Sequence, residues 1–98
     1  MEVNLCVLLW AHQGRDADLN AHEDQVLGLL AEHDGQLIQR ARTVPRNSNN
    51  DEPTEVQLLR FGSEAALDAY MQDDRRVALA DQREKVIAMT EILRVRLD

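Results

Sequence analysis

The chain has 98 residues, which is enough for one compact domain built on a single hydrophobic core. Hydrophobic residues make up 44% and charged residues 30%, a balance typical of globular proteins. The formal net charge of -7 would repel a phosphate backbone, so we expect no nucleic-acid partner.

The cysteine content and the hydropathy of the chain bear on the cellular compartment in which we expect the protein. The single cysteine, Cys6, excludes an internal disulfide. The longest apolar run, from Leu5 to Ala11, is far shorter than the ~20 residues that a bilayer span needs. Glu2 stands where a signal peptide would be basic. We therefore expect a cytoplasmic protein with no membrane contact.

The first half of the chain predicts a strand, a helix and a second strand. Residues 3–10 are apolar and β-branched, which indicates a strand buried on both faces. Apolar residues then recur at helical spacing from Asp16 to His33, with Asp16 or Asp18 as the N-cap and Asp34-Gly35 as the turn that ends the helix. Residues 36–44 alternate well enough for a second strand.

The second half begins with a polar connection from Pro45 to Pro53, followed by a third strand over residues 55–61. Ser63 is the expected N-cap of the next helix, and Asp73-Asp74 is expected to cap a further helical piece. Residues 90–97 predict the last strand. The side chains expected to face inward from these two helices are Leu67, Tyr70, Met71, Val77, Ala80, Val86 and Ile87.

The order β-α-β-β-α-β predicts one α+β domain spanning residues 1–98, with a ferredoxin-like antiparallel sheet in the order 4-1-3-2 and both helices on one face. The first strand is apolar on both faces, so the face without helices also needs a cover. A second copy of the chain, packed sheet against sheet about a two-fold axis, would provide it. We therefore expect a homodimer.

Residues spread over nearly the whole chain carry a family resemblance. They are Glu23, Leu29-Leu30, His33-Asp34-Gly35, Pro53 to Val56, Leu59-Arg60-Phe61, Ser63 to Tyr70 and Arg75-Arg76. The pattern resembles the DUF1330-like branch of the dimeric α+β barrel superfamily and implies that fold and a dimer. Superfamily members include cofactor-free monooxygenases, isomerases of small lactones and haem-dependent enzymes, often with a pocket between sheet and helices. The pattern contains no catalytic signature that selects one of these activities.

Four residues are candidates for a ligand site between the sheet and the helices. His22 lies at the inward edge of the first helix and could transfer a proton, although a partly buried histidine bonded to the backbone is the simpler interpretation. Trp10, His12 and Tyr70 could hold a flat organic molecule by stacking. A position at the rim of the core or of a dimer interface explains the two aromatic residues, Trp10 and Tyr70, at least as well.

Nothing in the sequence predicts a metal or a cofactor. His22 and His33 are separated by ~16 Å along a helix, too far to share an ion. His33 suits the negative end of the helix dipole, and Cys6 suits a small apolar position. Arginines recur on three strands and either bind an anion or, as we favour, pair with carboxylates such as Glu55 and Glu91; they are Arg40, Arg42, Arg60, Arg94 and Arg96.

Two functional hypotheses remain open. The first is a small-molecule-binding protein or cofactor-independent enzyme, monooxygenase-like or isomerase-like, that uses the pocket between sheet and helices. The second is a non-catalytic homodimeric accessory or interaction module. A cavity of at least ~300 Å³ with convergent polar groups would favour the first hypothesis, and a filled core would favour the second.

Overall fold

The computed structural model describes residues 1–44 and 52–98. Its elements in chain order are β1 (Val3–Ala11), α1 (Asp16–Leu27), the 3-10 helix η1 (Leu30–His33), β2 (Gly35–Arg42), β3 (Glu55–Phe61), α2 (Glu64–Met71), α3 (Asp74–Val77), α4 (Ala80–Val86) and β4 (Ile87–Arg94). Most of the expected connection from Pro45 to Pro53 lies outside the described residues. Within the described parts of the chain, no helix is both long enough and apolar enough to cross a membrane.

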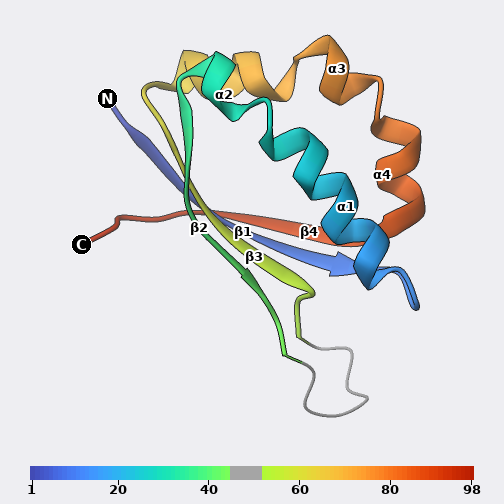
Figure 1. Ribbon diagram of the computed structural model, residues 1–98. Helices are drawn as coiled ribbons and strands as arrows, with labels where there is room; N and C mark the ends of the chain where they lie inside the picture. Colours follow the sequence, from blue (N-terminus) through green and yellow to red (C-terminus); the bar gives the residue numbers. More distant parts are fainter. Residues whose placement is uncertain (45–51) are drawn as a thin grey trace.

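The four strands form one antiparallel sheet in the order β2-β3-β1-β4. These are the neighbours of the expected order 4-1-3-2, read from the opposite edge of the sheet. The described helices lie on one face of the sheet (Figure 1). The predicted α+β, ferredoxin-like architecture is confirmed.

The first helical region differs from its expected form. The helix predicted from Asp16 to His33 divides into α1 and η1, because the chain leaves the α-helix at Gly28. Neither Asp16 nor Asp18 is the N-cap; Arg15 occupies that position and makes no side-chain capping bond. The turn after η1 agrees with the prediction, since Asp34 adopts the left-handed conformation with φ 53°.

The second helical region is broken into three short helices. Ser63 caps α2 as predicted, its hydroxyl accepting a 3.1 Å hydrogen bond from the Ala66 amide. Asp73 caps α3, accepting a hydrogen bond from the Arg75 amide. The last strand begins at Ile87 rather than at residue 90.

Three side chains expected to face inward are exposed instead. Met71, the last residue of α2, is 43% exposed. Val77 is 59% exposed and Ala80 is also exposed, because the helical phase restarts at the breaks between α2, α3 and α4. The expected burial of Val86 and Ile87 is confirmed.

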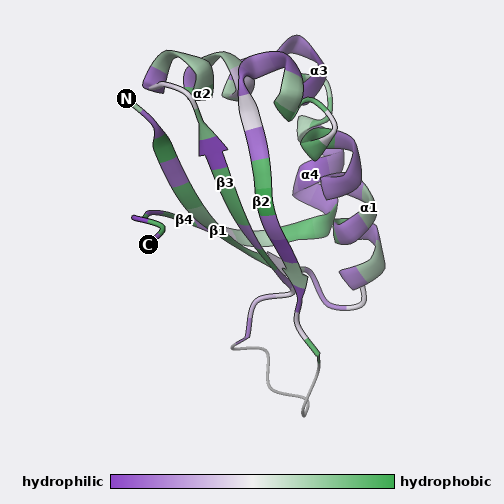
Figure 2. Ribbon diagram, turned by 60° about the vertical axis from the view of Figure 1, so that its left-hand side comes forward, coloured by the Kyte–Doolittle hydropathy of each residue, from purple (hydrophilic) through white to green (hydrophobic). Residues whose placement is uncertain are grey.

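The core lies between the helices and one face of the sheet. Alternate residues of β1, from Val3 to Leu9, point into it, and Phe61 of β3 and Leu19 of α1 are fully buried there. The ring centroids of Tyr70 and Phe61 are 5.4 Å apart. The Tyr70 hydroxyl donates a 2.9 Å hydrogen bond to the Val26 carbonyl. The strands carry hydrophobic segments while α4 is largely hydrophilic (Figure 2).

The opposite face of the sheet, here named the open face, has an apolar middle, although Asn4, Arg60 and Glu91 also lie on it. Register places Cys6 of β1 beside Leu58 of β3 on one side and Leu93 of β4 on the other. Two residues further along the strand, Leu8 pairs with Val56. No described helix covers this apolar surface.

Candidate functional site

A cavity of about 110 Å³ lies between the helix layer and strands β1, β3 and β4. Its apolar walls include Leu5, Val7, Leu9, Leu59, Phe61 and Leu67. Met71 and Ile92 also line it and are 43% and 47% exposed, which places them at its mouth. The volume is below the ~300 Å³ typical of ligand pockets, so the size criterion set for the first hypothesis is not met. It approaches the ~150 Å³ of an engineered cavity that accepts benzene.

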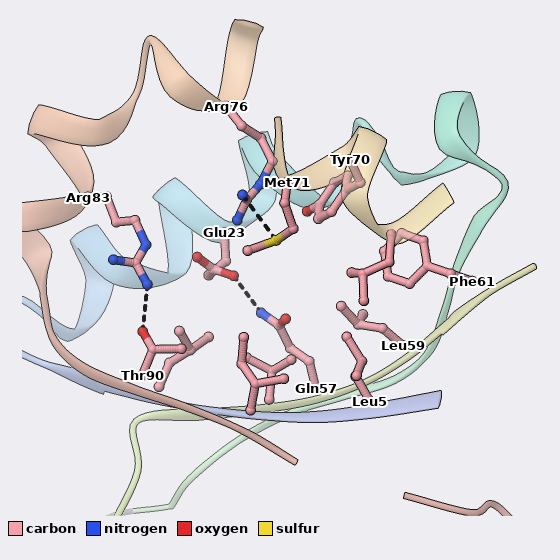
Figure 3. A pocket seen from close by; sticks show the side chains of 14 residues that line it. Leu5, Glu23, Gln57, Leu59, Phe61, Tyr70, Met71, Arg76, Arg83 and Thr90 are labelled. Carbon is pink, nitrogen blue, oxygen red and sulfur yellow. Dashed lines mark hydrogen bonds between the residues drawn. The ribbon is translucent and has the colours of Figure 1, made fainter. Parts of the chain in front are cut away.

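Polar groups converge on this cavity from both layers. Glu23 enters from α1, and Gln57 and Thr90 rise from the sheet. Arg76 and Arg83 reach down from α3 and α4 (Figure 3). The cavity therefore has apolar walls and ionisable groups along its helix side.

Glu23 is the carboxyl group of the cavity. The residue is 6% exposed, and its Oε1 accepts a 2.7 Å hydrogen bond from Gln57 Nε2. Burial raises the pKa of Glu23, although the Gln57 hydrogen bond and the charges of Arg76 and Arg83 partly oppose that rise. A carboxyl group with a raised pKa can both hold and release a proton closer to neutral pH.

A second buried carboxylate lies next to this site. Glu55 is fully buried, and its oxygens accept hydrogen bonds from Arg40 Nε at 2.8 Å and from Asn20 Nδ2 at 2.7 Å. Gln57 Nε2 donates a further 2.6 Å bond to Glu55. Gln57 therefore joins the cavity acid Glu23 to a carboxylate that is already neutralised by Arg40.

Arg76 lies at the cavity against Tyr70. Its Cζ is 4.7 Å from the centre of the Tyr70 ring, which is cation–π geometry. Its Nη1 contacts the Met71 sulfur at 3.5 Å, a weak acceptor. Its Nε is buried and has no hydrogen-bond partner among the described residues. Burial raises the pKa of Tyr70, so this phenol stays neutral.

Arg83 is held by the sheet rather than by an acid. Its Nη2 donates a 2.8 Å hydrogen bond to the hydroxyl of Thr90 on β4. Thr90 therefore fixes the guanidinium above the cavity (Figure 3).

The structure does not bring the four expected ligand residues together. Tyr70 lines the cavity. Trp10 pairs with Met89 on the open face, on the other side of the sheet. His12 is exposed just beyond β1, with its Nε2 3.0 Å from the Glu84 carbonyl oxygen. The proposed stacking site formed by Trp10, His12 and Tyr70 is therefore not assembled.

His22 is enclosed behind the cavity rather than within it. The residue is 2% exposed, and its Nε2 lies 4.0 Å from Glu23 Oε2. Burial lowers the pKa of His22, and the charges of Arg83 and Arg76 lower it further. Its Nδ1 has no hydrogen-bond partner in the described parts of the chain. His22 thus adjoins the cavity acid without lining the cavity.

The strand arginines pair with carboxylates, as favoured, and do not form one anion site. Arg40 pairs with Glu55 and Asp24, and Arg42 lies 3.9 Å from Asp24. The other three contact acids elsewhere: Arg60 contacts Glu2, Arg94 contacts Glu64 and Arg96 contacts Asp98. Glu91, an expected partner, is not among them.

No family model matches the chain, and no curated protein matches its sequence. Solved structures do match. One is a dimeric protein of unknown function and ferredoxin-like fold from Bacteroides fragilis, with 11% identity over 98% of this chain and 96% of that chain and a TM-score of 0.68. Another is a dabb family protein with a ferredoxin-like fold from Mesorhizobium loti, with 13% identity, 99% and 98% coverage and a TM-score of 0.69. A third is SnoaB, a cofactor-independent oxygenase from Streptomyces nogalater, with 11% identity, 99% and 95% coverage and a TM-score of 0.69.

The chain has the ferredoxin-like fold that these structures share. The resemblance found in the sequence is therefore confirmed for the fold. The DUF1330-like branch remains a prediction.

Sequence reasoning missed four cavity residues: Glu23, Gln57, Arg76 and Arg83. Two of them had a readable signal. Glu23 lies between Leu19 and Val26 on the buried stripe of α1, and Gln57 alternates with Leu59 and Phe61 on the inward face of β3. Charged or amide side chains at such positions indicate a buried polar site.

The described residues contain no group of three or more His, Cys, Asp or Glu side chains placed to hold a metal ion. Cys6 lies on the open face and is partly buried.

Proposed function

We propose that this protein is a homodimer that binds a small organic molecule in the cavity between sheet and helices and acts on it without a cofactor. The observation that carries the proposal is the buried carboxyl of Glu23, which lies with two guanidinium groups on the helix side of a cavity with apolar walls. A purely structural core gains nothing from such groups, because burying them costs free energy.

Glu23 replaces His22 as the proposed proton-transfer group. Its carboxyl lines the cavity, whereas the His22 ring does not. Its raised pKa suits proton transfer to or from a bound substrate. Gln57 holds Oε1 in place and leaves Oε2 for that exchange. The similarity in fold to SnoaB, which is a cofactor-independent oxygenase, supports cofactor-free chemistry as a class.

The homodimer is proposed from the open face. Cys6, Leu8, Val56, Leu58 and Leu93 form one apolar surface across three strands. Apolar surfaces of this kind mark contact sites in soluble proteins. A matching structure from Bacteroides fragilis is described as dimeric, and sheet-on-sheet packing about a two-fold axis would bury the surface against itself.

A fragment screen by ligand-observed NMR tests the binding site. Ile92→Trp places an indole at the half-exposed mouth of the cavity, and Val77→Trp adds the same group at an exposed position that does not line it. We expect fragments that bind the wild type and Val77→Trp but not Ile92→Trp. Fragments that bind all three proteins equally, or no binding at all, would refute the cavity as the site and favour the interaction module.

A further inference from the structure

Two arginines at the cavity differ from the other arginines of the described chain. Arg15, Arg40, Arg42, Arg60, Arg75, Arg94 and Arg96 each lie within 4.0 Å of a carboxylate oxygen. Arg76 and Arg83 have no such partner among the described residues, although the chain has 18 acidic residues and a net charge of -7. The two guanidinium groups without a carboxylate partner therefore both line this cavity.

Glu23 does not balance these charges. The charges of Arg76 and Arg83 each lower the pKa of Glu23, but neither guanidinium group forms an ion pair with its carboxylate within 4.0 Å. When Glu23 is ionised it neutralises one of the two positive charges, and when it is protonated it neutralises neither. The helix side of the cavity therefore carries an excess of positive charge in both states.

Arg76 is placed to bind an acceptor group of a ligand. Its Cζ lies 4.7 Å from the centre of the Tyr70 ring, and its buried Nε has no acceptor among the described residues. A buried donor without a partner is unfavourable, and an acceptor on a ligand would satisfy it. Arg83, tied to Thr90 by one nitrogen, keeps its other donors available over the same cavity (Figure 3).

The remaining walls specify the rest of the ligand. Leu5, Leu59 and Phe61 form an apolar floor beneath the charged side, which an inorganic anion would leave unfilled. The volume of about 110 Å³ admits a compact apolar group, and a longer one would extend past Met71 and Ile92. The geometry points to a small organic carboxylate as the ligand, with its anionic end between Arg76 and Arg83 and its apolar body on the sheet. This inference rests on the proposed function.

Calorimetry with matched probes tests it on the full chain at constant ionic strength. Benzoate is compared with benzamide and butyrate with butyramide, because each pair keeps the shape and removes the charge. Inorganic phosphate tests charge without an apolar body. We expect each carboxylate to bind the wild type at least about tenfold more tightly than its amide, and more tightly than phosphate.

Arg76→Met and Arg83→Met remove each charge while keeping an apolar side chain of similar length. We expect each to weaken carboxylate binding by about tenfold or more, while the neighbouring Arg75→Met, which removes an equal charge from an exposed position outside the cavity, changes it less than about twofold. The comparison of probes on the wild type needs no variant, so it holds even if a variant folds poorly.

Amides that bind as tightly as carboxylates, or unchanged affinity in both arginine variants, would overturn the carboxylate inference and leave small-molecule binding intact. Phosphate binding as tight as benzoate binding would reduce the site to an inorganic-anion site and also overturn it. If neither these probes nor any fragment binds, the proposed function fails together with the inference.

Discussion

The side-chain amide of Gln57 donates a 2.7 Å hydrogen bond to Oε1 of Glu23. The same nitrogen donates a 2.6 Å bond to Glu55, so both of its hydrogens are used. Gln57 thereby bridges two buried carboxyl groups, and these two groups have different environments. Glu55 has a guanidinium partner in Arg40, whereas Glu23 has none within ion-pair distance in the described parts of the chain.

The first prediction follows from the burial of Glu23. Its pKa is raised above the usual value of about 4.5, so ionisation at higher pH destabilises the folded state. The free energy of unfolding should therefore fall as pH rises from about 4.5 through the folded-state pKa. Glu23→Gln removes this titration, and we expect the variant to gain stability relative to the wild type between pH 4 and pH 8.

Urea denaturation across that pH range measures the effect, with Glu84→Gln as a control that removes an exposed carboxyl group on α4. Parallel stability curves for the wild type and Glu23→Gln would show that burial of Glu23 has no energetic consequence.

A second prediction concerns the buried pair of Arg40 and Glu55. Arg40→Met leaves the fully buried Glu55 carboxylate without its positive partner. Loss of one member of a buried pair costs about 3–5 kcal/mol, and we expect a loss of that order in chemical denaturation. Arg42→Met is the matched control on the same strand, since its side chain is 58% exposed and 3.9 Å from Asp24. It should change stability by less than about 0.5 kcal/mol. Equal losses in the two variants would contradict this account.

Acid sensitivity should depend on Asp73. Hydrogen bonds from the Arg75 guanidinium, then from His33 Nε2 at 2.7 Å and from the Arg75 amide, hold the pKa of Asp73 well below its usual value of 3.8. The stabilisation is present above pH 3.8 and is lost as pH falls towards the folded-state pKa. Asp73→Asn keeps a residue suited to the N-cap position but removes the charge.

We therefore expect Asp73→Asn to be less stable than the wild type near pH 7, with a difference that narrows between pH 4 and pH 2 in thermal melts. Asp74→Asn, the exposed neighbour, should show no comparable narrowing. A constant difference across the whole pH range would argue against the role of the charge.

The last prediction tests the open face. Leu58→Glu places a carboxylate in the middle of this surface, beside Cys6. Sedimentation velocity at micromolar concentration should give about twice the 11.2 kDa chain mass for the wild type and the single-chain mass for Leu58→Glu. Ala69→Glu adds the same charge to the exposed side of α2 and should remain dimeric. A wild type that sediments as a monomer would remove the proposed dimer.

The strands could be predicted because their signals are local. The apolar run over residues 3–10 and the Gly62-Ser63 stop after β3 fix those elements within about a residue. The helices were harder, because breaks at Gly28 and between α3 and α4 reset the helical phase. Val77 was expected inside on a continuous helix and lies outside on a broken one.

The location of the candidate site could be predicted from the sequence, but most of the residues that line it could not. Trp10 has the same strand parity as Cys6 and Leu8, so strict alternation already places it on the open face, away from Leu9 and the cavity. Arg76 and Arg83 belong to different short helices, and only their packing over the sheet brings them to one cavity. No spacing rule along the sequence predicts that meeting.

The double-sided apolar character of β1 has a consequence for strand register. On most strands a slip by one residue would drive apolar side chains into water, so hydrophobicity alone fixes the alignment. On β1 such a slip would exchange the apolar side chains of one face for those of the other face, so its free-energy cost is smaller. The alignment must then depend on polar contacts near the two ends of the strand, where Asn4 Oδ1 accepts a 3.1 Å bond from Arg60 and the Thr54 hydroxyl accepts a 3.0 Å bond from the Ala11 amide.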